Sequence, residues 1–147
     1  EHGLVCSQSD LESTTNDFSH QWGTSTPIIT GATGGTYGSG TDGKGAGLMN
    51  TFLIVSADRE DTDSAARLCA DLFEGGYGDW YLPSKGELNL MYNNLHVQNL
   101  GGFEEFGLYW SSSEVSSSKA WRQSFNNGSQ VDVDKITVAR VRAIRVF

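Results

Sequence analysis

The chain has 147 residues, 18 of them glycine, a hydrophobic content of 37% and a formal net charge of −8. This length suits one domain over residues 1–147 that buries its core without metals or many disulfides. No run of about 18 apolar residues is present, so we expect no membrane insertion. The acidic balance also disfavours nucleic-acid binding, which depends on neutralising phosphates.

The charge is unevenly distributed. Residues 1–114 carry 4 basic and 16 acidic groups, which gives −12, whereas residues 115–147 carry 6 basic and 2 acidic groups, which gives +4. The basic residues of the second part are Lys119, Arg122, Lys135, Arg140, Arg142 and Arg145. They either meet an anionic ligand or pair with the carboxylates of the acidic part.

The first third predicts one short strand and a long loop. Gly3–Cys6 is apolar enough for a strand, Trp22 is a buried anchor, and eight glycines follow between Gly31 and Gly47. The stretch from Gly38 to Gly45 is close to a phosphate-binding loop. It lacks the final hydroxyl residue and a preceding strand, so we reject that interpretation.

The next part predicts a helix preceded by a charged turn. Met49–Ala57 suits either a strand or a short helix. The acidic turn Asp58–Asp63 lacks the glycine and distal glutamate of a calcium-binding EF-hand, and its carboxylates suit a helix start. The apolar face of the helix that follows is expected to comprise Ala66, Cys69, Ala70, Leu72 and Phe73.

A second helix is specified by the stretch that begins at Gly76. Trp80–Leu82 indicates a short buried strand that Pro83 ends. Ser84 and Glu87 have the spacing of a capping box. Beyond this box an apolar stripe follows at helical spacing, formed by Leu88, Met91, Tyr92 and Leu95.

The last third predicts short antiparallel strands. They cover Tyr109–Glu114, Ala120–Phe125, Gln130–Lys135 and Val138–Phe147. The turn Asn126–Gly128 is the strongest hairpin signal, and we expect Trp110 and Trp121 to face the core.

No motif in the chain indicates catalysis, a cofactor or a metal. The three histidines lack metal-ligand spacing, and Ser111–Ser113 lacks the surroundings of a nucleophile elbow. Cys6 and Cys69 are the two cysteines, and we expect one disulfide of an exported protein, with two buried free thiols as the alternative.

Together these anchors resemble the Lcl C-terminal domain family, named for the C-terminal domain of the Legionella collagen-like adhesin. The motifs WYLPSKGELNLMY (residues 80–92) and YWSSSE (residues 109–114) carry most of the resemblance. It implies an α+β, C-type-lectin-like fold with two helices, small twisted antiparallel sheets and long glycine-rich loops. It also implies a secreted or cell-surface homotrimer that binds sulfated glycosaminoglycan without catalysis.

We therefore expect a site for sulfated glycosaminoglycan, another glycan or another cell-surface ligand in the C-terminal basic and polar segment. Its expected residues are Lys119, Arg122, Lys135, Arg140, Arg142, Ser116, Ser117, Ser118, Asn126, Asn127 and Ser129. The resemblance leaves two alternatives open. One is a protein-recognition variable domain of a diversity-generating retroelement, because residues 115–138 are rich in the residues that such rewriting produces. The other is a purely structural trimerisation head.

Overall fold

A computed structural model describes residues 3–13, 17–23, 28–33 and 45–147 of the chain. The stretch Gly38–Lys44 and most of the glycine-rich loop lie outside these residues. The helices are α1 (Ala46–Ala57), α2 (Ala65–Ala70), α3 (Lys85–Asn94) and the 3-10 helix η1 (His96–Gln98). The strands are β1 (Leu4–Cys6), β2 (His20–Gln21), β3 (Leu108–Glu114), β4 (Lys119–Ser124), β5 (Gln130–Asp134), β6 (Val138–Ala139) and β7 (Ile144–Val146).

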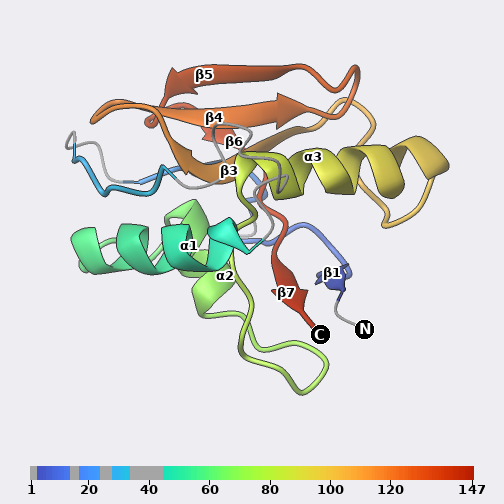
Figure 1. Cartoon of the computed structure of the whole chain (residues 1–147), viewed down its shortest axis with the longest axis horizontal. Helices are drawn as coiled ribbons and strands as arrows, with labels where there is room; N and C mark the ends of the chain where they lie inside the picture. The colour runs from blue at the N-terminus through green and yellow to red at the C-terminus, as the bar shows by residue number, and fades with distance from the viewer. Residues whose placement is uncertain (1–2, 14–16, 24–27, 34–44) are drawn as a thin grey trace.

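The strands form three small antiparallel sheets, which confirms the α+β prediction. Their orders are β1-β7, β2-β6 and β3-β4-β5. The three-stranded sheet lies along one side of the molecule with α3 beneath it, and α1 and α2 lie farther down (Figure 1). Met49–Ala57 proves to be helical, so the described residues contain three α-helices rather than the two expected.

Helix α3 begins as the sequence predicts. The Ser84 hydroxyl accepts a hydrogen bond from Glu87 N–H, and the Glu87 carboxylate accepts one from Ser84 N–H at 2.9 Å. Glu87 also accepts from Gly45 and Gly47, so this buried carboxylate ties the start of α1 to the start of α3. Tyr81 is buried as expected, although it forms only an isolated bridge with Ile144.

The β4–β5 hairpin confirms the predicted turn. Gly128 has a φ of 77°, a left-handed conformation that favours glycine. A side chain there would also collide with the Tyr92 ring, because a Cβ atom would lie 2.5 Å from its Cε1. Trp110 is fully buried as predicted, but Trp121 is only partly buried, with the Lys85 ammonium 3.5 Å from its ring centroid.

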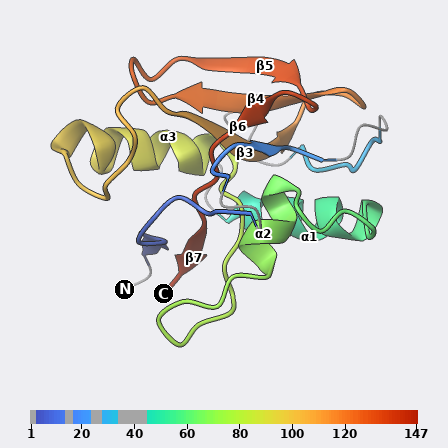
Figure 2. The ribbon, with the colours of Figure 1, turned by 180° about the vertical axis from the view of Figure 1, so that it is seen from behind.

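The chain ends pair with each other. Strand β1 lies antiparallel to β7, with Leu4 opposite Val146 and Cys6 opposite Ile144. Figure 2 shows this ribbon on the same side of the molecule as both termini, below α3. It closes the second of two hydrophobic clusters, which contains Tyr81, Leu88, Met91, Tyr109, Phe125 and Ile144.

Two expectations need correction. Cys6 and Cys69 are free thiols rather than a disulfide, because Cys6 packs against the second cluster whereas Cys69 belongs to the first. Burial raises the pKa of both thiols, most strongly for Cys69. Phe73 lies beyond the end of α2 and is 76% exposed, so it does not contribute to an apolar helix face.

Candidate ligand-binding cleft

The serines and asparagines predicted to bind ligand lie at opposite ends of the three-stranded sheet. Ser116, Ser117 and Ser118 form the β3–β4 turn beside Lys119, whereas Asn126, Asn127 and Ser129 form the β4–β5 turn. Strand β4 separates the turns by about 17 Å at a rise of about 3.3 Å per residue. The structure therefore does not bring these residues together as one site.

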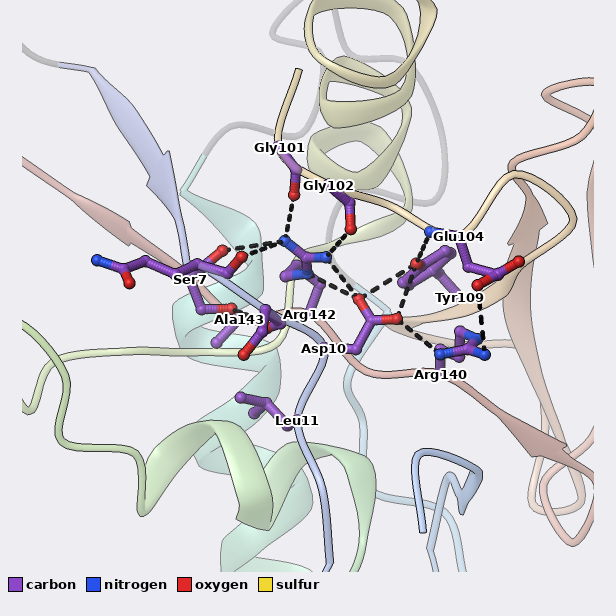
Figure 3. Close-up of polar contacts among 12 residues, drawn as sticks. Ser7, Asp10, Leu11, Gly101, Gly102, Glu104, Tyr109, Arg140, Arg142 and Ala143 are labelled. Carbon is purple, nitrogen blue, oxygen red and sulfur yellow. Dashed lines mark hydrogen bonds and ion pairs between the residues drawn. The ribbon is translucent and has the colours of Figure 1, made fainter. Parts of the chain in front are cut away.

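Arg142 is the first of two cations that are buried rather than available to a ligand. Its side chain is fully buried, and its guanidinium donates to the Asp10 carboxylate from Nε at 2.8 Å. It also donates to Gly101 O at 2.7 Å and to Gly102 O at 3.1 Å (Figure 3). This is the pairing of basic tail with acidic body that the sequence left open.

Lys135 is the second buried cation. Its ammonium lies 2.6 Å from Glu114 Oε1, and the two side chains are 6% and 2% exposed. Glu114 also accepts backbone hydrogen bonds from Thr30 and Gly31. Lys135 additionally donates to Ile28 O, so this pair fastens residues 28–31 to the sheet.

The remaining predicted cations are partly exposed, and two of them form ion pairs. Arg140 donates to Asp10 at 3.0 Å and lies 3.8 Å from Glu104, and Lys119 lies 3.4 Å from Asp132. Arg122 is partly buried, and its Nε has no hydrogen-bond partner. These contacts leave little unpaired positive charge for a sulfated polymer.

A cleft of about 400 Å³ opens instead beside the β4–β5 turn. Its walls come from the end of α3, η1, the loop that follows η1 and the turn after β4. The lining residues are Tyr92, His96, Val97, Asn99, Leu100, Gly102, Phe103, Glu105, Phe125 and Asn126. Of the residues predicted from sequence, only Asn126 lines this cleft.

Four aromatic rings pack together beneath the cleft. Phe125 is buried at their centre, with ring centroids 5.5 Å from Tyr92, 5.1 Å from His96 and 5.0 Å from Phe103. Tyr92, His96 and Phe103 are each partly exposed. The lining of the cleft therefore combines aromatic rings with the polar side chains of Asn99, Glu105 and Asn126.

The buried network around Asp10 supports one wall of the cleft. Arg142 holds the carbonyls of Gly101 and Gly102, and its guanidinium lies 4.3 Å from the Phe103 ring centroid. The Tyr109 hydroxyl accepts from Glu104 N–H at 2.9 Å and donates to Asp10 (Figure 3). Burial and the neighbouring Asp10 carboxylate raise the pKa of Tyr109 above its ordinary value, so the phenol remains a donor at neutral pH.

Arg142 thus positions one wall of the cleft without lining the cleft itself. Buried charge-assisted hydrogen bonds hold loop 101–104 in one conformation, since breaking them would strand a guanidinium away from water. Asn99, the one non-glycine with positive φ in the described part of the chain, turns the backbone at the start of this loop. The sequence did not predict the cleft, because its residues are dispersed between positions 92 and 126. The glycine pair of Gly101–Phe103 was a local signal of the loop that forms one wall.

The cleft lining offers aromatic packing surfaces and hydrogen-bonding groups. His96 is engaged in ring contacts with Tyr92, Phe103 and Phe125. Within residues 3–13, 17–23, 28–33 and 45–147, no group of three or more His, Cys, Asp or Glu side chains is placed to hold a metal ion. No helix in the same ranges is long and apolar enough to cross a membrane.

Comparison with known proteins gives a likeness to a solved structure. No protein-family model matches the sequence, and no curated protein matches it. A crystal structure of a fimbrial protein from Bacteroides ovatus superposes with a TM-score of 0.63 at 15% identity. The match covers 98% of this chain but 35% of that one. At this identity the likeness establishes a shared fold, and the chain spans about a third of that relative.

Proposed function

We propose that this chain is a non-catalytic ligand-binding module of a bacterial surface or secreted protein, with a C-type-lectin-like fold. The likeness to a fimbrial protein, a component of a surface appendage, supports the location. The resemblance of the sequence to adhesin head domains supports the same role. In this proposal the ligand is a glycan, and the aromatic cleft beside the β4–β5 turn receives it.

The observation that carries this proposal is the combination of partly exposed aromatic rings and polar side chains in the lining of one cleft. A sugar ring presents one face of C–H groups and an edge of hydroxyls. The partly exposed rings of Tyr92 and Phe103 suit the C–H face, and Asn99, Glu105 and Asn126 suit the hydroxyls. Binding sites commonly combine apolar walls with a few polar groups that fix orientation.

The charges favour a neutral glycan over a sulfated one. Among the residues that the structure describes, no lysine or arginine lines the cleft, whereas Glu105 does, and the whole chain carries −8. A sulfated polymer would be repelled at long range by this acidic surface. Two of the cations expected to bind glycosaminoglycan, Lys135 and Arg142, are engaged in buried ion pairs.

A glycan array read with the purified chain at low and high salt tests the proposal. We expect binding to neutral glycans that changes little with salt and that falls roughly 10-fold in Asn126→Ala, the equivalent of about 1.4 kcal/mol. The matched control is Lys119→Ala at the opposite end of β4. Salt-sensitive binding to sulfated chains that Lys119→Ala abolishes would overturn the cleft in favour of the basic segment.

Recognition of a protein is the second candidate. The residue types expected of a rewritten variable segment lie largely on the surface here, including Ser116, Asn126, Ser129, Val131 and Ile136. Exposed positions on a rigid hairpin suit a paratope. A blank glycan array, together with a reverse-transcriptase gene and template repeat beside the coding sequence, would favour this candidate. Light scattering would test the expected homotrimer in either case.

A further inference from the structure

A second hollow lies between α3 and the β1–β7 ribbon, and we call it the ribbon groove. It encloses about 500 Å³. One wall is formed by residues 3–6 of the ribbon together with Ile144 and Val146. The facing wall includes Leu90 and Met91 of α3 and Leu95, which caps the end of this helix. The groove is therefore mainly apolar and is independent of the aromatic cleft.

Strand β1 has a free edge. Gly3 and Phe147 exchange backbone hydrogen bonds at 3.0 Å, and Ser7 N–H donates to Ala143 O at 2.9 Å. In this alternating antiparallel ladder the peptide groups of Leu4 and Cys6 point away from β7. Within the part of the chain that the structure describes, no backbone–backbone hydrogen bond is made to these outward-pointing groups.

The opposite edge of the ribbon is already occupied. Tyr81 N–H donates to Ile144 O at 2.8 Å, and Ile144 N–H donates back to Tyr81 O at 2.9 Å. Any strand added to this ribbon would therefore pair with β1 rather than with β7.

The free edge and the groove coincide. Successive side chains of a strand point to opposite faces, so a hollow on one face touches alternate residues, as it does along β7 with Ile144 and Val146. Along β1 the groove touches four consecutive residues, 3–6. This is the pattern of a hollow that reaches round the strand to its backbone edge.

We propose that the ribbon groove binds an extended peptide segment of another polypeptide, which adds to β1 as a third strand. Its backbone would pair with the outward N–H and C=O groups of Leu4 and Cys6, and alternate apolar side chains would enter the groove. Strand addition of this kind takes affinity from main-chain hydrogen bonds and specificity from pockets for alternate side chains. The proposal does not depend on glycan binding by the cleft.

Panning a phage-displayed library of random nine-residue peptides against the full chain tests this proposal. We expect selected peptides to share apolar residues at alternate positions. Their synthetic versions should slow hydrogen exchange at the Leu4 and Cys6 amides at least 10-fold. Methylating the peptide nitrogens on the pairing edge should abolish binding, because methylation removes the donors.

A matched pair of variants locates the groove. Val146 is 42% exposed and lines the groove, whereas Val131 of β5 is 43% exposed and does not line it. We expect Val146→Lys to weaken the selected peptides at least 10-fold and Val131→Lys to change their affinity less than 3-fold. Failure to select any peptide, apolar residues at helical spacing, or equal losses in both variants would overturn the proposal. None of these outcomes bears on glycan binding.

Discussion

Replacing Asp10 by alanine tests whether the buried network holds the fold and the cleft wall together. The Asp10 carboxylate accepts hydrogen bonds from Arg142 Nε at 2.8 Å, Arg140 Nη1 at 3.0 Å and the Tyr109 hydroxyl at 3.0 Å. Asp10→Ala would leave the Arg142 guanidinium, whose side chain is 0% exposed, without a counter-charge. Breaking a buried pair by removing one partner costs about 3–5 kcal/mol.

Urea unfolding followed by tryptophan fluorescence measures this loss. With a slope of about 2 kcal/mol per molar urea, the expected fall in midpoint is about 1.5–2.5 M. Asp79→Ala is the matched control, because Asp79 also pairs with an arginine through two hydrogen bonds, to Arg145 at 2.6 and 2.9 Å. This pair lowers the pKa of Asp79, but its carboxylate is exposed and solvent screens the interaction.

We therefore expect Asp79→Ala to unfold at nearly the wild-type urea concentration. If Asp10→Ala does not fold, Tyr109→Phe provides a milder test. It removes one donor to Asp10 and the acceptor of Glu104 N–H, at a cost of about 1–3 kcal/mol. Equal midpoints for the Asp10 and Asp79 variants, or a Tyr109→Phe variant as stable as wild type, would refute the reasoning.

Three further predictions concern the thiols, alkaline stability and the hairpin turn. Ellman's reagent should detect two thiols per denatured chain. In the folded chain it should not react with Cys69, because burial raises the pKa of that thiol. If neither thiol is detected in the denatured chain, the two cysteines form a disulfide. The stability advantage of wild type over Tyr109→Phe should be complete below pH about 10, which is the pKa of a phenol in the unfolded chain. It should fall as the pH rises further, because the pKa of Tyr109 is raised in the folded chain. A constant difference between the urea midpoints of the two proteins from pH 8 to 11 would contradict this. Gly128→Ala should cost at least about 1–2 kcal/mol of stability, because φ at this residue is 77° and the added methyl group meets an aromatic ring of α3. Gly102→Ala is the control, because Gly102 has a φ of 59° but open space around it. An equal loss of stability in the two variants would show that the ring contact is immaterial.

Local signals predicted much of the fold. The Ser84 capping box, the Asn126–Gly128 turn and the strand Leu4–Cys6 all depend on residues near one another in the sequence. Helix α1 was ambiguous because its pattern is unusual: Asn50 and Thr51 face inward, whereas Leu48 and Phe52 are 55% and 65% exposed. An apolar residue in such a helix does not identify the buried face.

The candidate site was less predictable because it depends on contacts between distant residues. The sequence shows that Arg142 is basic, but not that Asp10, 132 positions earlier, lies beside it. For the same reason Lys135 could not be assigned to Glu114. Charge alone therefore directed attention to the C-terminal segment, whereas the cleft arises where Phe125 meets Tyr92 and Phe103.

The central claim is that the aromatic cleft, rather than the basic segment, is the ligand-binding surface. Titrating the ¹⁵N-labelled chain with a panel of neutral monosaccharides and with heparin tetrasaccharide, and following backbone amide shifts, tests it most directly. We predict that shifts for a neutral sugar gather at His96, Phe103 and Asn126. Shifts confined to Lys119 and the β3–β4 turn, seen with heparin alone, would contradict the account.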